Sequence, residues 1–393
     1  MEQLTISLTS YPARITTVYK VIESLFEQTE KATEVVLWLS EQEFPQKHEN
    51  LPESLRRLIG KNGFRIEWVD DNLKSHKKYF YALQNRDSVV ITVDDDMYYS
   101  KNMVRTLMDS YRKHPNAISA RNVHVIFKEG NFISPYLKWE SHATEYIDKE
   151  RMDLCGIGVN GILYPPGCAS KRWFDKESIK MCAENQDDLW LKFNEIIDGI
   201  PVVYAGIEEE DILIRESQSN ALYIQNAHGG KNDICINQLM NRMQIKSRSI
   251  YENWFHHLMS MEEYIFTKKK YYRLKLEEIF ALYTQKDIYI CGAGNYAHIL
   301  LRFICRCGYE KKIKAFLVSS EIQDTCLNDD MPVKLINELK ENEAFSVICG
   351  VSKKYREEIK QSLEKYIYYN WIDINLQDIA RLEYLEECYD GVR

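Results

Sequence analysis

One apolar run constrains the fold of this 393-residue chain more than any other segment. Residues 89–93 read Val-Val-Ile-Thr-Val, and three carboxylates follow at once: Asp94, Asp95 and Asp96. A β-branched run without polar alternation is typical of a strand buried on both faces of a parallel sheet. The chain must therefore supply helices that cover both faces of that sheet.

The first 230 or so residues supply them, because strand-like and helix-like segments alternate there. We expect strands at residues 4–9, 35–39, 65–69, 89–93 and 116–125. We expect helices at residues 18–26, 77–83 and 102–112. This alternation predicts an open α/β sheet flanked by helices, in which ligands bind at the carboxyl ends of the strands.

The remainder of the chain reads differently. Residues 268–275 hold five basic residues in eight, within a helix-rich segment, so we expect a helical connector over 246–286. A second, Rossmann-like α/β unit follows, with strands at 288–291, 314–318 and 346–350 and helices at 295–305, 334–342 and 354–365. The predicted domains are 1–245, 246–286 and 287–393.

Charge and cysteine usage narrow the function class. Lys and Arg number 51 and Asp and Glu 59, which gives a net charge of −8 and argues against a nucleic-acid partner. The ten cysteines form no Cys-x-x-Cys pair, as expected of reduced thiols. The start of the chain lacks the pattern of a signal peptide, and no run of 18 apolar residues occurs, so we expect a cytoplasmic protein.

The acidic strand end is a candidate metal site. In an extended chain Asp94 and Asp96 face the same side, whereas Asp95 faces the other. Two converging carboxylates repel each other unless a cation lies between them, and hard oxygen ligands suit Mg²⁺ or Mn²⁺. Such an ion can bridge the diphosphate of a nucleotide. A solvated acidic turn is the alternative interpretation.

Two other strand ends carry side chains suited to a nucleotide. After the first strand come a ring and a fixed cation, in the set Thr9, Tyr11 and Arg14. The third strand is followed by acids for a base or ribose and lysines for a diphosphate: Asp70, Asp71, Lys77 and Lys78. Each residue alone also suits an ordinary surface loop. Their common placement at strand ends favours a ligand site.

In this order, these motifs resemble a GT-A fold glycosyltransferase, most of all the bacterial enzymes that build capsular, exopolysaccharide or lipopolysaccharide chains. The resemblance covers roughly residues 3–235. It implies an open mixed sheet and a nucleotide-sugar donor, with Asp94 and Asp96 on Mn²⁺ or Mg²⁺. It also implies donor nucleotide binding by Thr9, Tyr11, Arg14, Asp70, Asp71, Lys77, Lys78 and Asp95.

Two later segments fit the same resemblance. Residues 156–167 form a Gly- and Pro-rich loop of the kind that lies beside the sugar donor. The resemblance therefore implies that Asn160 and Gly161 contact the donor or the acceptor. The string from Glu184 to Leu191 resembles the acidic motif that begins a helix near the acceptor. Trp190 lies within this string and is a further candidate contact.

The acidic motif implies a catalytic base. In inverting members of the family a carboxylate here removes the proton from the acceptor hydroxyl, which assigns Asp188 as base and Asp187 as its neighbour. A helix start stabilised by two acids is the alternative. Further along the chain, the resemblance implies that His228 is a third metal ligand, although a lone histidine is commonly structural. Lys231 would help to neutralise the diphosphate.

One family motif is absent. The Gln-x-x-Arg-Trp signature of processive synthases does not occur in the matching region, so the resemblance implies a non-processive enzyme. We expect a UDP-sugar donor and a saccharide or lipid-linked glycan acceptor, with inversion at the anomeric carbon. A nucleotide-sugar binding or scaffold protein with a degenerate transferase domain is the alternative.

The second α/β unit has a Gly-rich turn between a strand and a helix. Gly292, Gly294 and Ala297 resemble the dinucleotide-binding fingerprint, but the next strand ends in Ser319-Ser320 rather than an acid. We interpret the unit as an accessory module that binds a ligand, dimerises or packs. A nicotinamide-dependent oxidoreductase would not explain the acidic strand end. The basic run at 268–275 suggests peripheral contact with anionic lipid, or simply a solvated helix face.

Overall fold

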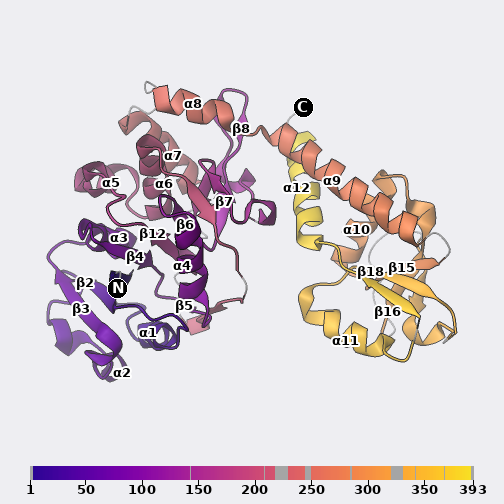
Figure 1. Cartoon of the computed structure of the whole chain (residues 1–393), viewed down its shortest axis with the longest axis horizontal. Coiled ribbons are helices and arrows are strands. Elements are labelled where there is room, and N and C mark those ends of the chain that lie inside the picture. The colour runs from indigo at the N-terminus through magenta and orange to yellow at the C-terminus, as the bar shows by residue number, and fades with distance from the viewer. Residues whose placement is uncertain are drawn as a thin grey trace. The chain divides into compact units, whose positions relative to one another are not determined.

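The computed structural model describes residues 3–141, 143–207, 209–216, 229–243, 249–283, 286–319, 331–340, 342–366 and 368–390. The chain forms two compact units, Met1–Ser260 and Met261–Arg393 (Figure 1). The division falls inside the segment for which we expect a connector. No helix among the described residues has an apolar stretch long enough to cross a membrane.

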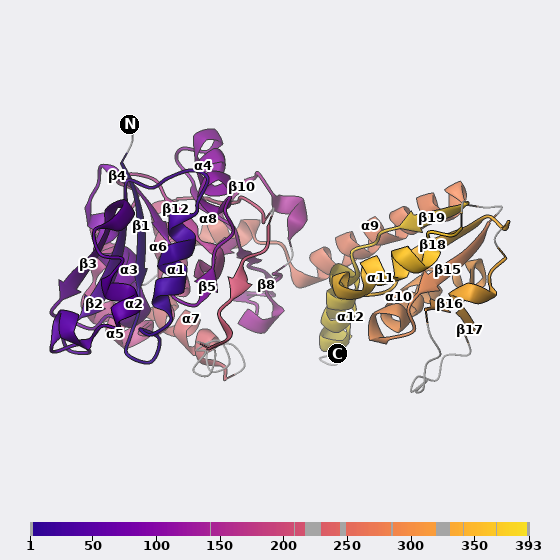
Figure 2. The ribbon, with the colours of Figure 1, turned by 90° about the horizontal axis from the view of Figure 1, so that it is seen from below.

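An eight-stranded mixed sheet forms the centre of the first unit, in the order β10-β13-β6-β12-β4-β1-β2-β3 (Figure 2). Its strands are β1 (Gln3–Thr9), β2 (Glu34–Ser40), β3 (Phe64–Val69), β4 (Ser88–Thr92), β6 (Ile118–Ala120), β10 (Glu150–Arg151), β12 (Ile162–Tyr164) and β13 (Val202–Tyr204). β1 is parallel to β2 and β4, whereas β12 is antiparallel to β4 and β6. The expected mixed α/β sheet is confirmed.

Helices cover both faces of this sheet. They are α1 (Val18–Phe26), α2 (Glu53–Arg56), α3 (Lys77–Phe80), α4 (Met103–Lys113), α5 (Lys176–Cys182), α6 (Asp187–Asp198), α7 (Lys231–Arg242) and α8 (Ser249–His257). Apolar side chains at alternate positions of β1, β2 and β4 pack under α1, α2 and α4 in one core. The short helix α3 contacts β1, β2 and β4. This packing fixes α3 close to the carboxyl end of β4.

Two sequence predictions differ from the structure. The strand expected at 116–125 is two strands, β6 and β7 (Val123–Val125), and β7 pairs with β11 (Leu154–Gly156) in a separate two-stranded sheet. The Gly- and Pro-rich segment 156–167 is not loop throughout, because β12 within it is buried between β4 and β6. Its Ile-Leu-Tyr core favours pairing despite the flanking glycines and prolines. Two pairs of short strands lie outside the main sheet: β5 (Met97–Tyr98) pairs with β14 (Ile212–Leu213), and β8 (Lys128–Glu129) pairs with β9 (Phe132–Ile133).

The second unit holds a parallel five-stranded sheet in the order β17-β16-β15-β18-β19. Its strands are β15 (Asp287–Cys291), β16 (Ile313–Val318), β17 (Val333–Leu335), β18 (Phe345–Cys349) and β19 (Tyr369–Ile372). Its helices are α9 (Met261–Leu282), α10 (Asn295–Arg306), α11 (Lys353–Leu363) and α12 (Leu376–Asp390). The first strand is central and the order reverses beside it, as in doubly wound sheets.

The helix predicted at 334–342 is wrong. The segment begins as β17, which pairs with the edge of β16, and continues as a single 3₁₀ turn over Ile336–Glu338. Pairing with a neighbouring strand overrides local helix propensity here. Strand β19 and helix α12 carry no pattern that we recognised in the sequence.

Candidate active site

The acidic strand end turns sharply. β4 ends at Thr92, and Asp95 and Asp96 lie in a turn that leads into β5. The strand alternation therefore stops before the acids, and an arginine from the turn after β1 contacts two of them. Nη1 of Arg14 lies 2.8 Å from Oδ1 of Asp95 and 3.0 Å from Oδ2 of Asp96.

The turn after β1 holds Asp95 from the other side. The Ser10 hydroxyl donates to Oδ2 of Asp95 at 2.6 Å, and the guanidinium carbon of Arg14 lies 5.7 Å from the Tyr11 ring centre. Burial raises the pKa of Asp95, while Arg14 and Ser10 oppose that shift. Asp95 therefore ties the β1 turn to the end of β4. Ser10 belongs to the same motif as Thr9, Tyr11 and Arg14, but the sequence assigned it no role.

Lys78 is the cation at the centre of the site. Its Nζ lies 2.5 Å from Oδ1 of Asp94 and 2.9 Å from Oδ2 of Asp187, and its side chain is only 5% exposed. Burial by itself lowers the pKa of Lys78, but Asp187, Asp94 and Asp188 together raise it well above the ordinary value. The ammonium group therefore stays charged and joins the strand end to the start of α6.

The two acids at the start of α6 have opposite properties. Gln186 occupies the N-cap, so Asp187 and Asp188 lie in the first turn, where the helix dipole favours negative charge. Burial favours a raised pKa at Asp187, but Lys78 and then His76 lower it to about 2. Burial, then Asp187 and Asp94, raise the pKa of Asp188 well above the usual range.

The backbone of Gly158 lies close to the charged groups of Lys78, Asp188 and Asp94. Its backbone N–H donates to Oδ1 of Asp188 at 3.2 Å. A Cβ at this position would lie 2.9 Å from Nζ of Lys78, 3.3 Å from Oδ1 of Asp188 and 3.6 Å from Oδ1 of Asp94. Only glycine leaves this space open. As a whole residue, Asp188 is half-buried.

A buried ion pair supports the Gly158 loop. Nη1 of Arg121 donates to Oδ2 of Asp211 at 2.8 Å and to the carbonyl of Asn160 at 3.1 Å. The Asn160 amide donates to Asp211 at 2.8 Å. This side chain, which was predicted to contact the sugar donor, therefore helps to hold the loop in place. No sequence pattern marked Arg121 or Asp211 as functional, since Asp211 ends the acidic run 208–211, which is typical of a solvated turn.

Two predicted donor-site residues face other partners. Nζ of Lys77 lies 3.0 Å from Oε2 of Glu43 and 3.2 Å from Oδ1 of Asn72, with the side chain 1% exposed. Lys77 therefore does not join the acids at the end of β4, because α3 turns it away from Lys78. The Thr9 hydroxyl donates to the carbonyl of Trp38 at 2.8 Å, across to β2.

The two acids after β3 have different surroundings. Asp70 is exposed, whereas Asp71 accepts from the Tyr81 hydroxyl and pairs with Lys176. Burial favours a raised pKa at Asp71, but these two partners lower it overall. Lys231 is the exposed first residue of α7.

Trp190 does not line the site. Its side chain is fully buried, and its Nε1 donates to the carbonyl of Trp173 at 2.9 Å. The apolar spacing that begins at Leu189 is the packing face of α6 and not a ligand surface. Gly161 has a φ of 95°, which glycine adopts readily, and it turns the chain into β12.

The acids after β4 are chemically suited to a divalent ion. The side chains of Asp94 and Asp96 are 30% and 13% exposed, although Oδ1 of Asp96 is buried. Within the part of the chain that the structure describes, no group of three or more His, Cys, Asp or Glu could hold a metal. The third expected ligand, His228, lies outside the described residues.

The Gly-rich turn of the second unit follows β15 as expected. Gly292 has a φ of 87°, and a Cβ there would lie 2.4 Å from Cγ1 of Val351. Gly294 is the N-cap of α10, and Ala297 is fully buried. Close packing therefore accounts for Gly292 and Ala297. Residues 320–330, just after β16, lie outside the described residues.

Comparison with known proteins gives distant structural similarity only. No protein-family model and no curated protein matches the chain. The crystal structure of S. aureus TarS 1–349 matches at 14% identity and a TM-score of 0.33, over 79% of this chain and 88% of that one. The same fragment in complex with UDP-GlcNAc matches at 13% identity and 0.35, over 64% and 71%. A further crystal structure of S. aureus TarS matches at 12% identity and a TM-score of 0.31, over 65% of this chain and 44% of that chain. We base the function proposed below on the site.

Proposed function

We propose that the first unit is a GT-A type glycosyltransferase that moves one sugar from a nucleotide-sugar donor to an acceptor. The observation that carries this proposal is the arrangement of acids around Lys78. Two neighbouring carboxyl groups, Asp187 and Asp188, have pKa values moved in opposite directions, beside a third acid at a strand end. Such a split is typical of a site that uses one carboxylate as a base and another as a fixed charge.

The donor would bind at the carboxyl edge of β1 and β4. Tyr11 and Arg14 offer a ring and a cation beside the strand end. Asp94 and Asp96, with His228, would hold Mg²⁺ or Mn²⁺. When bound, that ion would stabilise the negative charge of the departing nucleotide diphosphate.

Asp188 would act as the base of a single inverting displacement. The acceptor oxygen forms a bond to the anomeric carbon as the bond from that carbon to the diphosphate oxygen breaks. The acceptor proton passes to the carboxylate of Asp188, whose raised pKa makes it a stronger base than an ordinary aspartate. Asp187 remains ionised and holds Lys78 in place.

The wider assignment follows from the sequence resemblance. We propose that the donor is a UDP-sugar and that the acceptor is a saccharide or a lipid-linked glycan. The reaction would belong to bacterial surface polysaccharide synthesis and would take place in the cytoplasm.

Contact with anionic lipid would involve α9, where Phe266 is 69% and Leu274 50% exposed beside Lys270. On the same helix Lys268 and Lys269 pair with Asp378 and Glu386 of α12. A homodimer through the second unit is part of the same proposal.

A test separates catalysis from binding. The full chain is incubated with UDP-sugars and Mn²⁺, and both thermal stabilisation and release of UDP are measured. We expect metal-dependent stabilisation and slow donor hydrolysis, both lost in Asp96→Ala. The matched control is Asp109→Asn, an exposed acid on α4 that pairs with Arg112. Hydrolysis that survives Asp96→Ala unchanged would contradict the proposal.

The scaffold alternative predicts a different result. A nucleotide-sugar binding protein would bind UDP without metal and without turnover, with the binding site in residues 287–393. Calorimetry with UDP, with and without Mn²⁺, distinguishes the two. Binding that persists in Asp96→Ala and is lost in Gly294→Trp would favour the scaffold.

A further inference from the structure

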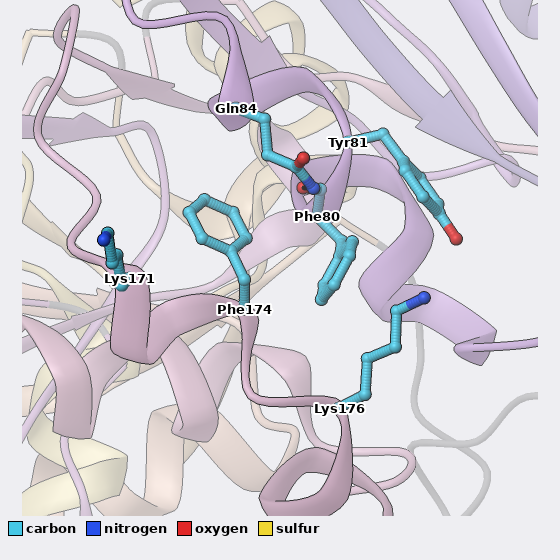
Figure 3. A pocket seen from close by; sticks show the side chains of 6 residues that line it. All are labelled: Phe80, Tyr81, Gln84, Lys171, Phe174 and Lys176. Atoms are coloured by element: carbon cyan, nitrogen blue, oxygen red, sulfur yellow. Dashed lines mark hydrogen bonds between the residues drawn. The ribbon is translucent and has the colours of Figure 1, made fainter.

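An open pocket of about 460 Å³ lies in the first unit, outside the acidic site. It is formed by the end of α3, the turn after it, and the segment that leads into α5 (Figure 3). Its lining residues are Phe80, Tyr81, Gln84, Lys171, Phe174 and Lys176. The proposed chemistry at Asp188 uses none of these side chains.

Aromatic rings form the floor of the pocket. The rings of Phe80 and Phe174 meet edge to face with centroids 5.5 Å apart, and those of Phe80 and Tyr81 with centroids 5.1 Å apart. Tyr81 also stacks on Trp38 of β2, with centroids 5.0 Å apart. Because these contacts fix the rings, they offer a rigid apolar surface on which the C–H face of a sugar ring can pack.

Positive charge flanks the rings. In Figure 3 the side chains of Lys171 and Lys176 lie on either side of the ring of Phe174. Nζ of Lys176 lies 5.4 Å from the Phe80 ring centre and also pairs with Asp71. Lys171 is exposed and has no ion-pair partner among the residues that the structure describes. Among the described residues, Lys171 therefore gives the pocket an unpaired positive charge, in a chain whose net charge is −8.

The pocket is connected to the acidic site through two short elements. Helix α3 carries Lys78 on the side of the acids and Phe80 on the side of the pocket. Helix α5, which begins at Lys176, leads directly to the start of α6 with Asp187 and Asp188. A chain of sugars bound in the pocket would therefore lie close to the elements that carry the proposed base.

We propose that this pocket binds an acidic glycan, a sugar chain bearing carboxylate or phosphate groups, as a subsite for the acceptor. The inference rests on the proposed function and names its acceptor class. The rings would hold the apolar face of one sugar, and Lys171 would pair with an anionic group on that sugar or its neighbour, beside Lys176 and its partner Asp71. The Gln84 amide offers a hydrogen bond to a hydroxyl at the upper edge of the pocket.

The test measures glycan binding by calorimetry, without any donor. The probes are trigalacturonate, which is anionic, glucose 6-phosphate, which is a phosphorylated sugar, and maltotriose, which is neutral. We expect the full chain to bind at least one anionic probe and to bind maltotriose about tenfold more weakly or not at all. Which anionic probe binds more tightly distinguishes carboxylate from phosphate recognition. Equal binding of maltotriose, or no binding of either anionic probe, would overturn the proposal.

Substitutions place the binding in the pocket. Lys171→Ala should weaken binding of the anionic probe by about fivefold, since an exposed ion pair contributes up to ~1 kcal/mol. Lys171→Glu should weaken it further, and Phe174→Ala by about tenfold. The matched controls are Lys113→Ala and Phe132→Ala, which change an exposed lysine and an exposed ring elsewhere in the unit. Binding that is unaffected by either Lys171 variant contradicts the proposal.

The outcome is separable from that of the proposed function. If the protein releases UDP from a UDP-sugar but binds no anionic glycan, the pocket proposal is wrong and the proposed activity stands. If it binds trigalacturonate through Lys171 but never turns over a donor, the binding site stands and the acceptor role fails.

Discussion

Asp187 and Asp188 are adjacent in the chain, yet their carboxyl groups face different partners. Oδ2 of Asp187 lies 2.9 Å from Nζ of Lys78, whereas Oδ1 of Asp188 accepts the backbone N–H of Gly158 at 3.2 Å. Asp187 therefore keeps a low pKa of about 2, while the pKa of Asp188 is raised by burial and by the charge of its neighbour. The same turn of helix therefore holds two carboxyl groups whose pKa values are shifted in opposite directions.

Asp188→Asn should abolish transfer while leaving donor binding intact. An amide is close in shape to the carboxyl group but cannot take a proton, and loss of a general base typically costs about 10²–10⁴ in rate. The measurement compares kcat with the dissociation constant for UDP. A variant whose kcat falls less than tenfold would show that Asp188 is not the base.

The pH profile of Asp187→Asn tests the link between the two acids. In the unaltered protein the acid limb of kcat/KM should lie above the ordinary aspartate range of about pH 4, because the pKa of Asp188 is raised. The Asp187 charge is, after burial, the largest cause of that rise. The variant should therefore shift the limb to lower pH. Asp109→Asn, an exposed acid elsewhere, should leave it in place.

Asp187 also affects stability at low pH. Its pKa in the folded chain, about 2, is below the value of about 3.9 expected in the unfolded chain. The ionised group therefore stabilises the fold above about pH 4, and this stabilisation is lost as the pH falls toward 2. In Asp187→Asn, urea unfolding between pH 5 and pH 2 should lose less stability than in the unaltered protein.

Hydrophobic periodicity predicted much of the first unit. The helix expected at 18–26 is α1, and the strand expected at 89–93 differs from β4 by one residue at each end. These elements bury a continuous apolar face, so their pattern is local and readable. The helix prediction for 334–342 was wrong because the segment begins as an edge strand. That strand forms only by pairing with β16, which lies elsewhere in the chain.

The chemistry of the site was only partly predictable. The residue types after β4 and at the start of α6 indicated where acids gather. The partners of those acids depend on which way a short helix faces: adjacent Lys77 and Lys78 pair with Glu43 and Asp94, respectively. Arg121 and Asp211 are 90 positions apart, and no local pattern links them.

Lys78→Met should destabilise the fold strongly. It removes the cation shared by Asp94 and Asp187 and leaves both carboxylates without it in a buried setting. Breaking a buried pair of this kind typically costs about 3–5 kcal/mol. The free energy of urea unfolding measures the loss. Lys113→Met, at an exposed pair with Asp148, should change it by less than about 1 kcal/mol.

Gly158→Ala tests the space above the acids with the smallest change available. The added Cβ would lie 2.9 Å from Nζ of Lys78 and 3.3 Å from Oδ1 of Asp188, so the lysine end must shift and carry Asp94 with it. Because the far end of a lysine can move, the fold should survive with a small change in melting temperature. The acids would no longer keep their spacing, and kcat should fall by about 10²-fold, as expected for a displacement of about 1 Å in a catalytic group.

The matched control for Gly158→Ala is Gly294→Ala, where a Cβ meets no atom within 4 Å. Equal activity in the two variants would show that the close approach of Gly158 to Lys78 has no part in catalysis.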